Sequence, residues 1–227
     1  MNEISQATSK PRKGARKKYG PRDGTAQRHQ EIIDAARQVF ATKGFHAGTL
    51  GDVADLAGMS QAGILHHFGS KEDLLRAVLD QRDSLDSSEA RAAYGLDYFR
   101  HLVTVAKLNE SRPGIVQAYV VLSAEAVTEG NPGADYFTGR FEWLRGLVMG
   151  ELRKFSPLDD PLSDKELAAA ASNIIALMDG LQTQWLLNPG SFSLADATVF
   201  GIDAILSSVA AGGSRRHQVT AEDALKP

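Results

Sequence analysis

The fold is decided by residues 49–75, which read TLGDVADLAGMSQAGILHHFGSKEDLL. Thr49 and Asp52 are three residues apart, the spacing of a capping box, in which a hydroxyl and a carboxylate bind free N–H groups at a helix start. Gly58 suits the left-handed conformation that ends many helices, and Ser60 can cap the helix that follows. These signals predict two short helices joined by a tight turn.

Helical periodicity continues on both sides of this stretch. Apolar residues recur at steps of three and four from Ile32 to Phe40, which predicts a helix that starts after Thr25 and ends at Gly44. Later helices are expected at about 71–93, 96–109, 113–128, 134–155, 165–187 and 194–211. No alternating strand pattern of useful length competes. We therefore predict an all-α fold of about nine helices.

Composition narrows the class of protein. Of the 227 residues, 43% are hydrophobic and 23% are charged, which is ordinary for a globular protein. The absence of cysteine excludes disulfides, thiolate metal sites and a cysteine nucleophile. Neither a long uncharged apolar run nor a signal peptide is found, so we expect no membrane association and a cytoplasmic location.

Charge is distributed unevenly along the chain. The net charge of −3 divides into +3 for residues 1–85 and −6 for residues 86–227, and the positive excess lies mainly in residues 10–28. A basic segment on a more acidic body favours a partner with a phosphate backbone, although a solvated disordered tail has the same composition. We expect residues 1–24 to be a disordered basic arm and 212–227 a flexible tail.

Residues 25–75 resemble the DNA-binding domain of the TetR family. The matching runs are VFATKGF at 39–45, TLGDVADLAGMS at 49–60 and ILHHFGSKEDLL at 64–75. The resemblance implies a helix-turn-helix DNA-binding domain at 25–72 and a ligand-binding and dimerisation domain at 73–211. It also implies a homodimeric repressor that binds a palindromic double-stranded DNA operator and is released by a small-molecule effector.

Two other classes of function remain as alternatives. A ligand-independent repressor or nucleoid-type factor of the same fold would share the whole N-terminal argument. An enzyme is not expected, because the six histidines form no His-Glu-x-x-His pattern and neither a Gly-rich phosphate loop nor a nucleophile elbow is present. We accordingly expect no catalytic residue, cofactor or metal site.

The second short helix would enter the major groove of DNA with its first turn. Gln61 can pair with adenine or donate to a phosphate, and Ala62 offers a methyl group to thymine. Gly63 is costly within a helix, so it indicates either close approach of the backbone to DNA or simple tolerance in a short, braced helix. The expected DNA contacts are Thr49, Ser60, Gln61, Ala62, Gly63, His66, His67 and Lys71.

Contacts to phosphates are expected around this helix. The hydroxyl of Thr49 and the nearby N–H groups can reach the DNA backbone. His66 and His67 differ in direction by about 100° on the helix, so they cannot share one role. The resemblance implies a phosphate contact for Lys71. It also shows a departure at Leu65, where the family usually has an aromatic residue, so His66 or the basic arm must replace that contact.

A dimer is expected, because two recognition helices must be presented by a symmetric pair. The last two helices are the best candidates for its interface. Both begin with the capping-box spacing, at Ser163 with Glu166 and at Ser193 with Asp196. The resemblance implies a four-helix bundle between subunits, and the alternative is an ordinary intramolecular core. The expected interface residues are Ile174, Leu181, Trp185, Phe200, Ala204 and Ser208.

The resemblance places an effector pocket between the helices at about 95–185. Candidate lining residues are Phe99, Leu102, Tyr119, Leu122, Phe137, Phe141 and Met178, with Gln182 as a polar contact. The alternative for each aromatic residue at helical spacing is packing in the core. This composition favours an apolar or amphipathic effector, since ligand pockets are mostly apolar with a few placed polar groups.

Overall fold

The computed structural model describes residues 23–90 and 93–213, with side chains described for 25–83 and 93–213. Nine α-helices and one short 3-10 helix occupy these ranges, which contain no β-strand. The helices are α1 (Asp23–Ala47), α2 (Leu50–Ala57), α3 (Gln61–Phe68), α4 (Lys71–Ala90), α5 (Leu96–Glu110), α6 (Pro113–Glu125), α7 (Ala134–Leu152), η1 (Arg153–Phe155), α8 (Asp164–Leu187) and α9 (Leu194–Ala210). The predicted all-α fold is confirmed. Nearly all of the expected basic arm and flexible tail lies outside the described residues.

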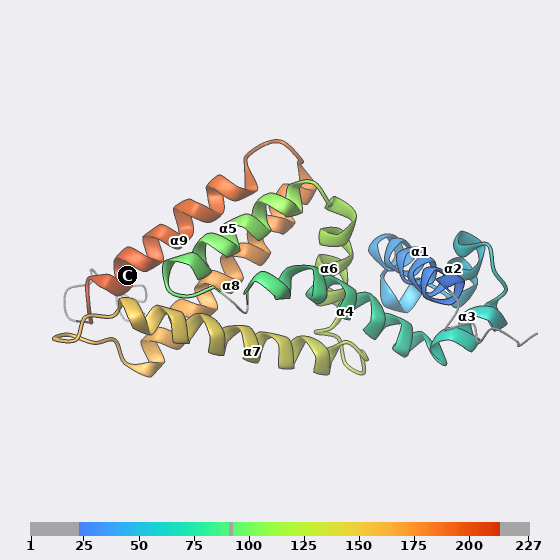
Figure 1. Ribbon diagram of the computed structural model, residues 1–227, viewed down its shortest axis with the longest axis horizontal. Coiled ribbons are helices and arrows are strands. Elements are labelled where there is room, and N and C mark those ends of the chain that lie inside the picture. The colour runs from blue at the N-terminus through green and yellow to red at the C-terminus, as the bar shows by residue number, and fades with distance from the viewer. Residues whose placement is uncertain (1–22, 91–92, 214–227) are drawn as a thin grey trace, which may run out of the picture.

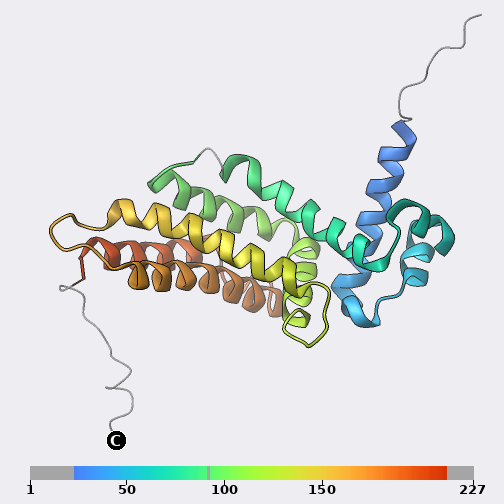
Figure 2. The same ribbon diagram turned by 90° about the horizontal axis from the view of Figure 1, so that it is seen from below.

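The helices form two groups in an elongated molecule (Figure 1). The helices α1, α2 and α3 gather at one end, and α5, α7, α8 and α9 run beside one another towards the other end (Figures 1 and 2). The long helix α4 extends from the first group towards the second, and α6 lies between the groups, packed against α1. None of the described helices combines the length and the hydropathy that a membrane span requires.

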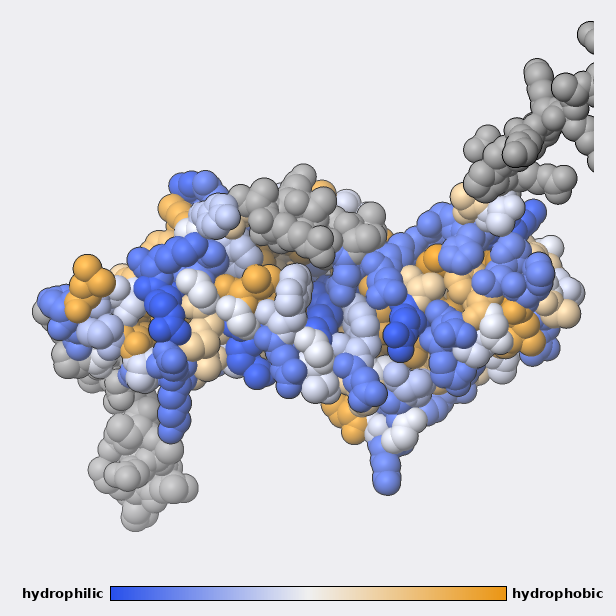
Figure 3. All heavy atoms as spheres, turned by 60° about the horizontal axis from the view of Figure 1, so that its bottom comes forward, coloured by the Kyte–Doolittle hydropathy of each residue, from blue (hydrophilic) through white to orange (hydrophobic). Residues whose placement is uncertain are grey.

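The surface of the molecule is mixed in polarity. The face in Figure 3 carries mostly hydrophilic side chains, with apolar side chains in separate patches. The apolar residues that the periodicity singles out are instead gathered in core clusters beneath the surface.

A first core cluster joins α1–α4 to the centre of the molecule. Ile32 and Phe40 of α1, Val53 of α2, Ile64 of α3 and Leu74 of α4 are fully buried. The same cluster continues through residues of α6, the turn after it and α7, namely Tyr119, Leu122, Ala126 and Phe137. The N-terminal helices therefore pack against the larger group through a shared apolar core.

A second cluster fills the space between α5, α7, α8 and α9, and includes Phe99 and Ile174. A third, smaller cluster contains Trp185 at the end of α8. Ile174 is 0% exposed and Trp185 is 7% exposed. At these two positions the packing supports the alternative interpretation of the stripe as intramolecular core.

The helix ends agree closely with the local sequence signals. The capping boxes at Thr49 and at Ser163 are both present, and Gly58 ends α2 in the left-handed conformation with φ 62°. The first helix differs from its prediction, because it continues past Gly44 to Ala47 with a kink at Gly44, where φ is 74°. A residue without a side chain accommodates this positive φ at little cost.

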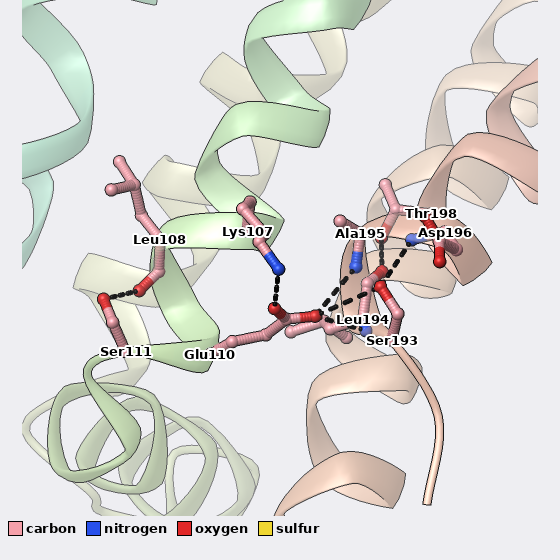
Figure 4. Close-up of polar contacts among 9 residues, drawn as sticks. All are labelled: Lys107, Leu108, Glu110, Ser111, Ser193, Leu194, Ala195, Asp196 and Thr198. Atoms are coloured by element: carbon pink, nitrogen blue, oxygen red, sulfur yellow. Dashed lines mark hydrogen bonds and ion pairs between the residues drawn. The ribbon is translucent and has the colours of Figure 1, made fainter. Parts of the chain in front are cut away.

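The start of α9 is capped differently from its prediction (Figure 4). The hydroxyl of Ser193 accepts a hydrogen bond from the Asp196 amide at 3.1 Å, but no return bond from the Asp196 carboxylate is found among the described contacts. Instead, Glu110 at the end of α5 accepts bonds from the Leu194 amide at 2.8 Å and the Ala195 amide at 3.4 Å. The cap thus comes from a helix distant in the sequence.

Candidate functional site

The two short helices α2 and α3 are held from their inner faces. Val53 and Ala54 of α2 and Ile64 and Phe68 of α3 are buried in the first core cluster. The hydroxyl of Ser60 caps α3 by accepting a hydrogen bond from the Gly63 amide at 3.1 Å. The outer face of α3 is consequently presented on a braced scaffold.

The start of α3 is the exposed part of this scaffold. Gln61 and Ala62 are exposed, and the described residues offer no hydrogen-bond partner to the side-chain amide of Gln61. Leu65 and His66 are exposed one turn further along, with 39% of Leu65 accessible. These side chains are available to a partner that approaches the helix from outside.

Packing within the protein explains why position 63 is a glycine, which the sequence did not reveal. A Cβ atom at this position would lie 3.1 Å from Met59 Cε and 3.4 Å from Ser60 Oγ. Such contacts are tight, so the Met59 side chain would have to move. The glycine therefore allows the turn residue to pack against the first turn of α3, in addition to whatever approach it permits from outside.

Thr49 is already engaged within the protein. Its hydroxyl and amide bind the Asp52 carboxylate, both at 2.9 Å, and Asp52 also accepts from Lys43 at 2.7 Å. The hydrogen bonds from Lys43 and Thr49 lower the pKa of Asp52 to about 2. The first N–H groups of a helix have no partner within the helix, so the start of α2 still offers backbone donors beside Thr49.

The two histidines of α3 occupy different surroundings. His66 is exposed, whereas His67 is half-buried with its ring centroid 6.4 Å from that of His29 on α1. His29 in turn lies 4.2 Å from the ring centroid of Phe68. His66 therefore remains the better placed of the two for an outside contact.

Lys71 at the start of α4 is also held internally. Its ammonium lies 4.3 Å from the centroid of the Phe45 ring and 3.4 Å from the carbonyl oxygen of His46. Both groups belong to the C-terminal end of α1. In the absence of a partner molecule, Lys71 stabilises the junction of α1 and α4.

The charge of the folded N-terminal part differs from that of the first 85 residues as a whole. Residues 25–83 contain six Lys and Arg against eight Asp and Glu, a net charge of −2. Residues 1–24 contain seven Lys and Arg against two Asp and Glu, a net charge of +5. The positive excess predicted to favour a phosphate partner is therefore carried by the N-terminal segment and not by the helices.

A large cavity lies between α4, α5, α7 and α8. Its volume is about 650 Å³, within the usual range for ligand pockets. Its apolar wall is formed mainly by Leu102, Val105, Trp143, Leu144, Leu147, Val148, Ile174, Ile175 and Met178. Its polar lining is formed by Asp80, Arg82, Asp83, His101, Asp135, Tyr136, Arg140, Asp179 and Gln182.

Three of the expected pocket residues line this cavity: Leu102, Met178 and Gln182. The other five do not. Phe99 is buried in the second core cluster, and Tyr119, Leu122, Phe137 and Phe141 pack in or against the first. These aromatic and aliphatic side chains fill the junction between the helix groups, as the core alternative anticipated.

The polar end of the cavity contains an ordered charge network that the sequence interpretation missed. Arg140 donates to the Asp83 carboxylate at 3.0 Å and to the Tyr119 hydroxyl at 3.0 Å. The Tyr136 hydroxyl donates to Asp83 at 2.5 Å, and the Arg82 guanidinium stacks 3.5 Å from the centroid of the Tyr119 ring. The sequence contained one signal that could have revealed this network, namely charged residues on helix faces that are otherwise apolar.

Asp179 stands apart from this network. It lines the cavity, and burial raises its pKa above the ordinary value despite the opposing charges of Arg82 and Arg140. Neither a hydrogen bond nor an ion pair joins its carboxylate to the rest of the described chain. The cavity therefore contains a carboxylate that the protein does not neutralise by direct contact.

The outer face of α9 exposes a row of small and apolar side chains. Phe200 is 80% exposed, and Ala204 and Ser208 are exposed at the following four-residue steps. Leu181 of α8 is partly buried. Of the six expected interface residues, the three on α9 thus lie on an accessible face, whereas Ile174 and Trp185 are internal.

Comparison with known proteins identifies the family. The model of bacterial regulatory proteins of the tetR family matches residues 32–78, which span the helix-turn-helix. The transcriptional regulator TtgR of Pseudomonas putida is 32% identical over 182 residues, which cover 72% of this chain and 82% of TtgR. The chain belongs to the TetR family. As a member, it is a DNA-binding transcriptional regulator, and its relatives are regulators and not enzymes.

Solved structures of transcriptional regulators share the fold over about four fifths of this chain. SCO4454 from Streptomyces coelicolor superimposes with a TM-score of 0.67 at 19% identity, covering 82% of this chain and 97% of SCO4454. FadR from Bacillus subtilis, solved in complex with stearoyl-CoA, gives a TM-score of 0.60 at 18% identity, covering 79% of this chain and 98% of FadR. At these identities the likeness concerns the fold alone.

Proposed function

We propose that this TetR-family protein is a repressor that binds a two-fold-symmetric DNA operator in the cytoplasm as a homodimer and leaves it when a small molecule occupies the cavity. Residues 25–72 form the helix-turn-helix domain in this proposal, and 73–211 form the ligand-binding and dimerisation domain. The observation that carries the proposal is α3, whose inner face is fixed by Ile64 and Phe68 while Gln61 and Ala62 project without partners.

The proposed contacts divide according to exposure. Gln61 and Ala62 read base edges, and Gly63 lets the backbone approach the groove. Thr49, together with the free amides of α2, and His66 bind phosphates. The other expected contacts, Ser60, His67 and Lys71, hold the recognition helix in place, and Lys71 can reach a phosphate only by leaving its partners on α1.

The proposed dimer forms through the exposed face of α9, with Phe200, Ala204 and Ser208 against the partner's equivalent helix. Burial of an exposed phenylalanine favours association, because apolar surface leaves water. Leu181 contributes from α8, whereas Ile174 and Trp185 support this face from inside the protomer. A symmetric pair is required because half-sites one helical turn apart need two recognition helices.

The helix α4 connects the cavity to the DNA-binding end. Its first turns place Leu74 and Leu75 in the N-terminal core, and its later turns place Arg82 and Asp83 in the wall of the cavity. A ligand that changes the position of the cavity wall therefore acts on the helix that holds α3.

A second connection runs through α6. Glu125 accepts a hydrogen bond from the Phe45 amide at 2.5 Å, and Gln117 donates to the Ala41 carbonyl at 3.1 Å. Both contacts hold the C-terminal half of α1. Because α1 packs on α2, a shift of α6 is transmitted to the recognition unit by direct contact.

Release of DNA follows from a population shift. A ligand changes the equilibrium only through its different affinities for the DNA-binding conformation and for one with displaced recognition helices. The cavity favours this ligand-responsive mechanism over the alternative of a ligand-independent repressor, since its volume of about 650 Å³ and its mostly apolar lining with a few polar groups are typical of ligand pockets.

Selection of bound sequences from a random duplex library tests the proposed DNA-binding mode. The full-length protein is expected to enrich an inverted repeat whose half-sites are centred about one helical turn apart, or a multiple of it. Enrichment of an asymmetric motif, or no enrichment over the starting library, would contradict the proposal.

A further inference from the structure

The two arginines of the cavity are committed to groups of the protein. Arg140 donates to Asp83 and to the Tyr119 hydroxyl, and its charge also lies 5.1 Å from the Tyr119 ring centroid. Arg82 stacks on the same Tyr119 ring and lies 3.6 Å from Asp83. Both cations therefore already lie beside the Asp83 carboxylate and the Tyr119 side chain before any ligand enters.

Two further polar side chains that line the cavity are on α8. Asp179 and Gln182 are three residues apart, so they lie on the same face of the helix, and both line the cavity. Gln182 is only 3% exposed, and its carbonyl oxygen has no hydrogen-bond partner among the described residues. Leaving a buried polar group unsatisfied is costly, which indicates a place for a polar group of a ligand.

The sign of the charge in the lining favours a cation. Four aspartates face two arginines around the cavity, namely Asp80, Asp83, Asp135 and Asp179 against Arg82 and Arg140. With Asp83 already paired to Arg140, the uncompensated charge is negative. A carboxylate or phosphate head group would be repelled by Asp179, whereas a protonated nitrogen would gain a charge-assisted hydrogen bond.

The remainder of the cavity suits an apolar body. Leu102 and Val105 of α5, Leu144 of α7, and Ile175 and Met178 of α8 contribute apolar side chains to its lining. A molecule that fills it buries apolar surface, which supplies affinity, while the polar end fixes its orientation.

We propose that the cavity selects an amphipathic molecule with a protonated amine, whose nitrogen donates to Asp179 and binds beside Gln182 while its apolar part lies along α5, α7 and α8. This assignment rests on the proposed function only in taking the cavity to be the effector site. It names the chemical class of the ligand, which the fold does not determine.

The test compares three probes that share one ten-carbon chain: decylammonium and decanoate, each below its micellar concentration, and decanol below its solubility limit. Binding to the full-length protein is measured by calorimetry and by the fluorescence of Trp143, one of the two tryptophans and the one that lines the cavity. Decylammonium should bind about tenfold or more tightly than decanol, because a desolvated charge pair is strong, and decanoate should bind most weakly. Tighter binding of decanoate, or no preference, overturns the proposal.

Two substitutions in the cavity and one control outside it locate the effect. Asp179→Asn should remove the preference for decylammonium over decanol, whereas Asp203→Asn, on α9 and outside this cavity, should keep that preference. Gln182→Leu should weaken both probes by removing the polar contact. An unchanged preference in Asp179→Asn contradicts the assigned role of this carboxylate.

DNA binding is measured separately, by mobility shift on a duplex from the random-library selection. If decylammonium binds through Asp179 but does not release DNA, the ligand class is supported and the release mechanism fails. If the protein binds no duplex at all, the proposed repressor function fails while the calorimetric result stands independently.

Discussion

Gln61 and Asp179 are the two side chains on which most of the proposed chemistry depends. Gln61 opens α3 with its side-chain amide free of any partner in the described chain, and Asp179 faces the cavity without a direct counter-ion. The sequence indicated the first, since helix starts are set by local residues. It did not indicate the second, because the surroundings of Asp179 come from three other helices.

Substitution of Gln61 by alanine should weaken binding to the selected duplex by between about 5-fold and 150-fold, since a bidentate base contact contributes about 1–3 kcal/mol. The reduction should be confined to duplexes that carry the preferred base at the contacted position. Gln184→Ala is the matched control, because Gln184 is an exposed residue of α8 whose side chain forms no hydrogen bond with the described chain. Mobility-shift titration measures both, and equal affinities for the two variants would refute the base contact.

Asp179→Asn should stabilise the ligand-free protein. Burial raises the pKa of Asp179, so the folded state holds the proton more tightly than the unfolded state, and the ionised carboxylate destabilises the fold at pH 7. Each kcal/mol regained should raise Tm by about 2–4 °C. The gain should shrink as the pH falls through the raised pKa, where the wild-type carboxylate is protonated. A lower Tm at pH 7 would show that the carboxylate has a stabilising partner.

At the scale of the helix, the residues at which a helix begins and ends are easier to predict than the face that it buries. The caps at Thr49, Gly58 and Ser163 follow from residues within one turn, and the structure confirms them. Which face of α6 or α7 is buried depends on contacts far along the chain. The spacing of Tyr119 and Phe137 was therefore compatible with a pocket, although both residues pack in the core.

The cap of α9 illustrates a contact that periodicity could not predict. Glu110 and the amide of Leu194 are 84 residues apart, yet they form a 2.8 Å hydrogen bond (Figure 4). This bond links α5, which lines the cavity, to α9, which carries the proposed dimer face. Coupling between ligand and dimer geometry can therefore pass through one carboxylate.

Replacement of Glu110 by glutamine should destabilise the protein by about 1 kcal/mol, the usual contribution of a helix cap, and lower Tm by about 2–4 °C. The hydrogen bond from Lys107 and the amides of α9 lower the pKa of Glu110. Its stabilisation is therefore present above the ordinary pKa of about 4.5 and disappears as the pH falls through the lowered value. In thermal melts from pH 7 to pH 3, the Tm of the Glu110→Gln protein should approach that of the wild-type protein as the pH falls.

The control for this cap is Glu129→Gln, an exposed residue after α6 whose side chain forms no hydrogen bond with the described chain. It should leave Tm unchanged at every pH. If Glu110→Gln behaves like the control, the negative charge of Glu110 contributes nothing to the stability of the cap.

At the scale of the molecule, the excess positive charge and the DNA-binding helices lie in different parts of the chain. The helices at the DNA-binding end carry a net charge of −2 over residues 25–83, while the first 24 residues carry +5. The net charge of the helix-turn-helix part therefore does not favour an anionic partner. We therefore expect most of the non-specific affinity to come from the N-terminal segment, since phosphate neutralisation dominates non-specific binding to DNA.

Removal of residues 1–20 should therefore weaken operator binding and flatten its dependence on salt. Each phosphate that the truncated protein no longer neutralises should reduce the slope of log K against log salt by about 0.9. Titrations at several salt concentrations, with full-length and truncated protein on the same duplex, measure this slope. Equal affinity and equal slope would mean that the basic segment does not touch DNA.

The central claim is that two copies of α3 are presented together by a symmetric dimer. The chain has no cysteine, so Leu65→Cys on the exposed face of α3 gives one spin label per protomer. Pulsed dipolar spectroscopy of the DNA complex should give an inter-label distance near the 34–36 Å that separates half-sites, about one helical turn. The added substitution Phe200→Asp should abolish the dipolar signal. No dipolar signal from the singly substituted protein, bound to DNA, would contradict the dimeric recognition of DNA.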